Sequence, residues 1–160
     1  MDQTTIQSTR IAYIEALWHH DIVSSAWQGF NSELDQQGLT FTIDRFQVPG
    51  SLEIPLQAKL LAESHDYNLI IAAGFIVDGG IYRHDFVAST VLDAMMRVQL
   101  DTGIPVLSIV LTPHQFQETD SHIDFFRQHL VGKGREAARA AAQTLTNLAQ
   151  LKSSERKVAC

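Results

Sequence analysis

YNLIIAAGFIV, residues 67–77, is the segment that decides how this chain folds. From Leu69 to Val77 it carries apolar side chains and one glycine, so a strand made from it has two apolar faces. Such strands occur in parallel sheets that helices cover on both sides. The run has nine residues, far fewer than the roughly 20 of a membrane-spanning helix. We therefore predict a buried strand in the middle of an α/β domain.

Apolar runs and amphipathic segments alternate around this strand. The runs predict three more strands, at residues 11–17, 41–48 and 104–111. The amphipathic segments predict helices that begin near Asp21, Ser51 and Phe86. Gly38 and Gly103 follow two of these helices as stop signals. The alternation predicts a three-layer α/β/α sandwich with a central parallel sheet of flavodoxin-like order.

The last third of the chain is more polar. We expect a loop at residues 113–122, a short helical piece at 124–130 and a strong helix at 135–151. Residues 1–9 and 152–160 are expected to be flexible ends. A length of 160 residues fits one domain, so residues 1–160 are expected to form a single unit.

Composition narrows the classes of function. The net charge of −6 at pH 7 argues against general binding to nucleic acids or to anionic membranes. The one cysteine, Cys160, excludes an intramolecular disulfide and fits a reducing compartment. The first ten residues are polar and lack the pattern of a signal peptide. We therefore expect a cytoplasmic protein without a nucleic-acid or membrane partner.

Four loops are predicted to meet at one edge of the sheet, where parallel α/β proteins bind their ligands. They contain residues 18–20, 48–51, 77–84 and 112–114. In the third loop, Gly79-Gly80 would let backbone N–H groups approach an anion at a helix N-terminus. A tight turn that needs glycine for its dihedral angles is the competing explanation.

Two reactive side chains follow these glycines. Arg83 stays cationic and suits a phosphate or a developing oxyanion, but it cannot accept a proton. His84 titrates near neutral pH and could transfer protons. Taken alone, each is equally compatible with a solvated loop residue. Trp18, at the end of the first strand, could stack on a flat heterocycle or pack on the neighbouring helix.

The histidines do not predict a metal site. Their spacings match no metal signature, and the chain has neither an HExxH nor a CxxC motif. The nucleotide-binding glycine patterns and the GxSxG nucleophile motif are also absent from the sequence.

Five stretches together resemble the lumazine synthase family, in family order and over about residues 10–150. They are WHHDIV (18–23), VPGSLEIPLQAK (48–59), AAGFIVDGGIYRHDFV (72–87), IPVLSIVLT (104–112) and KGREAARAA (133–141). The resemblance implies condensation of 5-amino-6-(D-ribitylamino)uracil with 3,4-dihydroxy-2-butanone 4-phosphate to 6,7-dimethyl-8-ribityllumazine, in riboflavin biosynthesis. It also implies that no metal or organic cofactor is needed, and that homo-pentamers share each active site between neighbouring subunits.

The resemblance also implies roles for individual residues. Trp18 would stack on the pyrimidine, and the ribityl chain would bind at Ser51, Leu52 and Glu53. The pyrimidine would meet the backbone of Phe75, Ile76 and Val77, and the phosphate would meet Gly80 and Ile81. Ser108 would be a further substrate position. A phosphate-binding residue would be His122 by its distance from Thr112 or Arg127 by its chemistry.

The turn differs from the common family pattern, R-G-x-T-x-H-F-D. Here it is D-G-G-I-Y-R-H-D, which places Arg83 at the position of the catalytic histidine and His84 one residue later. This turn, together with Trp18, is similar to the type II subgroup of rhizobial-type bacteria. A flavin- or lumazine-binding oligomer with weak or lost catalysis is the alternative function that the altered turn leaves open.

The segment between Thr112 and Lys133 is longer than in family members that form icosahedral shells. It carries Phe125, Phe126, Arg127, His129 and Leu130, which we expect to form an exposed apolar patch. Pairing of two pentamers through this patch would give a decamer.

Overall fold

The computed structural model describes residues 9–79, 81 and 83–159. Its elements alternate along the chain, as the sequence predicted. They are β1 (Arg10–Ala16), α2 (His20–Gln36), β2 (Thr42–Val48), the short 3-10 helix η1 (Ser51–Glu53), α3 (Ile54–Glu63), β3 (Leu69–Phe75), α4 (His84–Thr102), β4 (Val106–Leu111) and α5 (Asp120–Val158). Gly38 and Gly103 have positive φ angles of 65° and 70° just after α2 and α4, which confirms them as helix stops.

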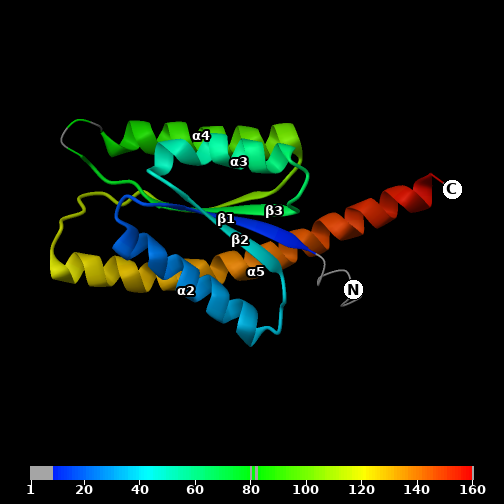
Figure 1. The fold of residues 1–160 in the computed structure, drawn as a ribbon, viewed down its shortest axis with the longest axis horizontal. Helices are drawn as coiled ribbons and strands as arrows, with labels where there is room; N and C mark the ends of the chain where they lie inside the picture. Colours follow the sequence, from blue (N-terminus) through cyan, green and yellow to red (C-terminus); the bar gives the residue numbers. More distant parts are fainter. Residues whose placement is uncertain (1–8, 80, 82, 160) are drawn as a thin grey trace.

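The four strands form one parallel sheet in the order β2-β1-β3-β4. This is the flavodoxin-like order over four strands. Every residue of β3 is buried, because the strand has a neighbour on each side and helices over both faces (Figure 1). The segment at 67–77 therefore forms the interior strand that its apolar run predicts.

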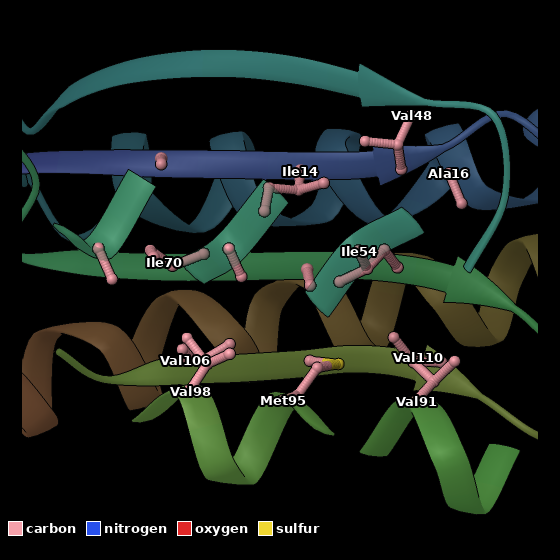
Figure 2. Packing of buried hydrophobic residues seen from close by; sticks show 14 of the residues in the cluster. Ile14, Ala16, Val48, Ile54, Ile70, Val91, Met95, Val98, Val106 and Val110 are labelled. Carbon is pink, nitrogen blue, oxygen red and sulfur yellow. The ribbon is translucent and has the colours of Figure 1, made fainter. Parts of the chain in front are cut away.

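The helices lie in two layers, with α3 and α4 over one face of the sheet and α2 and α5 over the other (Figure 1). Each layer closes its own apolar core. Ile70 and Ala72 of β3 belong to the core under α3 and α4, and Figure 2 shows Ile70 in the same cluster as Met95 and Val98 of α4. Ile71 and Ala73 face the opposite core. This confirms the three-layer sandwich.

Helices α2 and α5 approach so closely that they need glycine. A Cβ added to Gly134 would lie 2.0 Å from the carbonyl oxygen of Ala26 in α2. A Cβ added to Gly29 would lie 1.9 Å from the carbonyl oxygen of Val131 in α5. Both contacts are with backbone, which cannot rotate away as a side chain can, so the two glycines set the distance between these helices.

Helix α5 corrects the prediction for the last third of the chain. One helix of 39 residues replaces the short piece at 124–130 and the separate helix at 135–151, and it continues through residues 152–158. It begins at Asp120, inside the segment expected to be a loop, with Thr119 accepting a hydrogen bond from the backbone N–H of His122. The glycines at 132 and 134 do not end it, because packing against α2 stabilises the helix across them. No described helix, α5 included, is both long and apolar enough to cross a membrane.

The apolar patch expected at 125–130 is wrong in its extent. Leu130 is fully buried in the core, and Phe126 packs on Phe75 and Phe116 with ring centroids 5.2 and 5.7 Å away. Phe125 remains exposed, with its ring stacked on that of His129. Residues spaced by four on a helix share a face, so Phe126 and Leu130 face the core while Phe125 and His129 share the exposed face.

Candidate active site

The loops that follow the four strands lie at one edge of the sheet, here called the carboxyl edge (Figure 1). Backbone hydrogen bonds extend the sheet slightly into them. Leu17 N–H donates to the carbonyl of Val48 at 2.9 Å, and Ile76 N–H donates to that of Leu111 at 2.9 Å. The predicted meeting of these loops therefore occurs.

The turn before α4 is organised around His84, which is 8% exposed. Its backbone N–H donates to Asp78 Oδ1 at 3.0 Å, and its Nδ1 lies 2.8 Å from the same oxygen. These bonds lower the pKa of Asp78, the backbone bond being the main cause. The ring of His114, from the β4–α5 loop, packs at 90° to that of His84 with centroids 5.1 Å apart.

Arg83 is exposed and is held by its own turn. Its guanidinium donates to Asp85 at 3.1 Å and lies over the ring of Phe86, 4.7 Å from the centroid. Ile81, two residues before Arg83, is 90% exposed. Gly80 lies outside the described residues. The turn thus presents a fixed cation and a buried histidine side by side at the start of a helix.

Trp18 and the segment after β2 flank this turn across the carboxyl edge. Trp18, two residues after the end of β1, is 68% exposed. Leu52 and Glu53 are exposed in η1, whereas Ser51 is buried. Ser51 does not cap α3, as the sequence suggested, and lies instead against Gly74 of β3. A Cβ on that glycine would come within 2.7 Å of the serine hydroxyl.

Phe75, at the end of β3, belongs to an aromatic cluster on the face of the sheet that α2 and α5 cover. Its ring meets those of His19, Phe116 and Phe126 at centroid distances of 5.7, 5.0 and 5.2 Å. Ile76 is also buried, and Val77 is half-buried. The side chains of this strand end therefore belong to the core, which leaves their backbone as the part able to meet a ligand.

Two of the remaining predicted residues already have partners within the chain. His122 Nδ1 accepts from the backbone N–H of Gln117 at 3.2 Å. The Arg127 guanidinium donates to the Asp21 carboxylate and carbonyl at 3.2 and 3.3 Å. Ser108 is exposed in the middle of β4 and accepts from the backbone N–H of Val110 at 3.1 Å. In the part of the chain that the structure describes, these three make no hydrogen bond or ion pair with Arg83 or His84.

The described residues of the carboxyl edge include the exposed Trp18, Glu53 and Arg83. A hollow of about 560 Å³ lies at the opposite edge, with Asn68, Pro105 and Arg139 in its lining. Within residues 9–79, 81 and 83–159, no group of three or more histidine, cysteine or acidic side chains is placed to hold a metal ion.

These features define an α/β protein of flavodoxin-like topology whose strand ends gather an exposed indole, a cation and a buried histidine. Comparison with known proteins narrows the class. The family model for 6,7-dimethyl-8-ribityllumazine synthase matches residues 8–149, and the chain belongs to this family. The resemblance inferred from the sequence is thereby confirmed.

Close relatives carry the same name. The 6,7-dimethyl-8-ribityllumazine synthase of Rhodococcus erythropolis is 52% identical over 96% of this chain and 100% of its own length. The 6,7-dimethyl-8-ribityllumazine synthase 2 of Bradyrhizobium diazoefficiens is 53% identical over 89% of this chain and 86% of its own length. The protein of that second name in Pseudomonas syringae is 48% identical over 94% of this chain and 91% of its own length.

Two carboxylates at this edge were not predicted from the sequence to be site residues. Asp78 is the partner of His84, as described above. Glu15, fully buried near the end of β1, accepts from His20 at 3.3 Å and from Arg45. A charged residue inside an otherwise apolar strand is the one signal that could have drawn attention to Glu15.

Proposed function

We propose that this chain catalyses the condensation of 5-amino-6-(D-ribitylamino)uracil with 3,4-dihydroxy-2-butanone 4-phosphate to 6,7-dimethyl-8-ribityllumazine. The observation that carries this proposal is its 52% identity to an enzyme of that name over the whole length of the relative. The turn at the carboxyl edge supports it, because it offers both a cation for a phosphate and a group for proton transfer.

Proton transfer falls to His84 in this proposal. The reaction forms an imine, eliminates phosphate, closes a ring and releases water, and these steps add and remove protons. Arg83 cannot serve, because a guanidinium does not lose its proton in proteins. An imidazole, such as that of His84, can both accept and return a proton. These steps call for no metal and no organic cofactor.

The phosphate binds at the start of α4. Arg83 is exposed and cationic, and the N-terminus of α4 adds the partial positive charge of a helix end. In this proposal the phosphate also meets Gly80 and Ile81. His122 and Arg127 are candidates for a further phosphate contact, and Arg127 would have to leave Asp21 to make one.

The pyrimidine and its ribityl chain bind along the same edge. Trp18 stacks on the ring, and the backbone at Phe75, Ile76 and Val77 holds its polar edge. The ribityl hydroxyls meet Ser51, Leu52 and Glu53, of which Glu53 is exposed and can accept hydrogen bonds. Ser108 would contact substrate from β4.

Oligomerisation completes this site in our proposal. Helices α3 and α4 expose an apolar stripe at helical spacing, formed by Leu56, Leu60, Leu92, Met96 and Leu100. Large apolar side chains exposed together on neighbouring helices favour an interface between proteins. We place the stripe between the neighbouring subunits of a homo-pentamer, whose contacts would also bring a second chain over the carboxyl edge.

Two pentamers would pair to a decamer through the first turns of α5. The exposed contact residues there are Phe125 and His129, whose rings stack on each other.

We place the assembly in the cytoplasm, since one cysteine in the chain fits a reducing compartment. Two relatives bear the name synthase 2, which agrees with the type II features of the turn.

The test is turnover of the two substrates by the purified oligomer, followed through the absorbance of the lumazine product. His84→Ala is expected to lower kcat by roughly 10²- to 10⁴-fold, the usual contribution of a positioned proton-transfer group. Riboflavin or lumazine binding without turnover in the unaltered protein would favour the flavin-binding alternative. Full kcat in His84→Ala between pH 6 and 8 would assign proton transfer to another group.

A further inference from the structure

We propose that Asp78 is a positioning residue for His84, which holds the imidazole with its proton on Nδ1 and presents Nε2 as the acceptor. The inference rests on the proposed function, in which His84 transfers protons. Asp78 lies six residues before His84, on the other side of the turn that joins β3 to α4. Its hydrogen bonds are with His84, so in this proposal its effect on the reaction passes through the ring.

The geometry fixes the tautomer. Asp78 Oδ1 accepts a hydrogen bond from the backbone N–H of His84 at 3.0 Å, and a backbone N–H can only donate. The same oxygen lies 2.8 Å from His84 Nδ1. Since that oxygen acts as an acceptor, the nitrogen facing it must carry the proton. In a neutral imidazole the lone pair then lies on Nε2.

The side chain of Asp78 contacts His84 while remaining largely exposed to solvent. Its side chain is 63% exposed, whereas that of His84 is 10% exposed. Its bonds to His84 lower its pKa, so it stays ionised at neutral pH. It also satisfies the first N–H of α4, because Arg83, at the N-cap position, makes no side-chain cap.

The ring of His84 is restrained from a second loop as well. His114 packs edge-on against it, with ring centroids 5.1 Å apart and planes at 90°. The hydrogen bond to Asp78 fixes which way Nδ1 points, and the edge-on contact with His114 limits how far the ring can tilt. When Nε2 accepts a proton, the imidazolium that forms stays beside the Asp78 carboxylate, which stabilises the new charge.

Kinetics test the effect on the reaction. Asp78→Ala is expected to lower kcat by about 10- to 100-fold, part of the contribution of the proton-transfer group, while KM for the pyrimidine substrate changes less than about twofold. Asp78→Asn keeps an acceptor oxygen but loses the charge, so its kcat should fall between those of the unaltered protein and Asp78→Ala.

The matched control is Thr102→Ala. Thr102 bonds the carbonyl of Val98 at 2.6 Å and accepts from the N–H of Ile104, so this change also removes side-chain-to-backbone bonds of α4, at its other end. It should lower stability and leave kcat unchanged. An equal fall in kcat for Thr102→Ala and Asp78→Ala would overturn the proposal, because general loosening of α4 would then explain both.

Nuclear magnetic resonance tests the positioning without any turnover. The oligomer is labelled with 15N-histidine and studied at pH 8, above the ordinary pKa of histidine, and the signals missing in His84→Gln identify His84. We expect the Nδ1–H tautomer in the unaltered protein and its loss in Asp78→Ala. An Nε2–H tautomer, or spectra that Asp78→Ala leaves unchanged, would overturn the proposal. Full kcat in His84→Ala would count against the proton role of His84 alone, since the tautomer measurement stands apart from it.

Discussion

At the scale of single residues, the exposed indole of Trp18 leads to a direct prediction. Trp18→Ala should weaken binding of riboflavin or the lumazine product by about 1–3 kcal/mol, because the aromatic face on which the ring stacks is removed. Trp18→Phe should retain most of the affinity. Titration calorimetry on the purified oligomer measures both values.

Trp27 supplies the control for this substitution. It packs edge-on against Tyr13 with centroids 5.0 Å apart and lies under the Arg45 guanidinium, away from the carboxyl edge. Trp27→Phe should therefore leave ligand affinity unchanged. Equal affinity of Trp18→Ala and the unaltered protein would exclude the stacking role.

The sequence could indicate which residues at the strand ends are candidates for function, but it could not indicate their hydrogen-bond partners. Arg83 and His84 stand out because two reactive side chains follow glycines at a strand-to-helix junction. The contact of Asp78 with His84 depends on the path of the loop between them, and no periodicity encodes that path. The hydrogen bonds of Arg127 to Asp21 join residues 106 positions apart, so they depend on the docking of α5 against α2.

At the scale of elements, the contact between α2 and α5 predicts a strong response to one methyl group. Gly134→Ala would place a Cβ about 2.0 Å from the carbonyl oxygen of Ala26, so the helices must move apart. Overpacking of this kind costs about 1–3 kcal/mol of unfolding free energy. The midpoint of urea unfolding should fall accordingly.

Gly132→Ala is the matched control, two residues earlier in the same helix. A Cβ there meets nothing within 4 Å, and alanine favours a helix over glycine by up to about 1 kcal/mol. This variant should be as stable as the unaltered protein or more so. Equal stabilities of the two alanine variants would show that the helices do not depend on their close approach.

The ion pair between these helices predicts acid sensitivity. Hydrogen bonds from Arg139, at 2.8 and 3.2 Å, and from Gln37 lower the pKa of the buried Glu33 carboxylate. A pKa that is lower in the folded state contributes stability above the unfolded value, which is lost as pH falls through the folded one. Glu33→Gln should therefore be less stable than the unaltered protein at pH 7, with a difference that shrinks below about pH 4.3.

Urea unfolding at pH 7 and at several values below pH 5 checks this. The exposed Glu63, whose carboxylate lies 3.8 Å from Lys59, offers the comparison, and Glu63→Gln should change stability little at any of these pH values. A constant difference between Glu33→Gln and the unaltered protein down to pH 3 would contradict the assignment.

Strands and helices differed in how well the sequence predicted them. The four strands follow from local runs of apolar residues, and the structure places them within a few residues of the expected bounds. For the region of α5 the sequence predicted two helices and not one, and glycine between them weakens an isolated helix. Its continuity depends on α2, where Gly29 and Gly134 allow the backbones to touch, and a tertiary contact of this kind overrides local propensity.

At the scale of the whole molecule, the exposed stripe on α3 and α4 predicts the state of assembly. Light scattering at neutral pH should give a mass of ten copies of the 17.8 kDa chain. Leu60→Asp should break the pentamers, because a carboxylate cannot be buried in an apolar interface without a large penalty. Phe125→Asp should leave pentamers that no longer pair.

A leucine of similar exposure elsewhere provides the control. Leu151, in the last turns of α5, is 62% exposed against 57% for Leu60, and Leu151→Asp should leave the mass unchanged. A mass near sixty subunits, or pentamers alone at high concentration for the unaltered protein, would contradict the decamer.

Helix α5 leaves the sheet on the side away from the carboxyl edge (Figure 1). With 39 residues it is about 58 Å long at 1.5 Å per residue. The chain's one thiol, on Cys160, follows the end of this helix by two residues. A maleimide dye would therefore label each subunit at one position, without any substitution, and would pair with a fluorescent flavin bound at the strand ends. Energy transfer between the dye and the flavin would then report ligand occupancy optically.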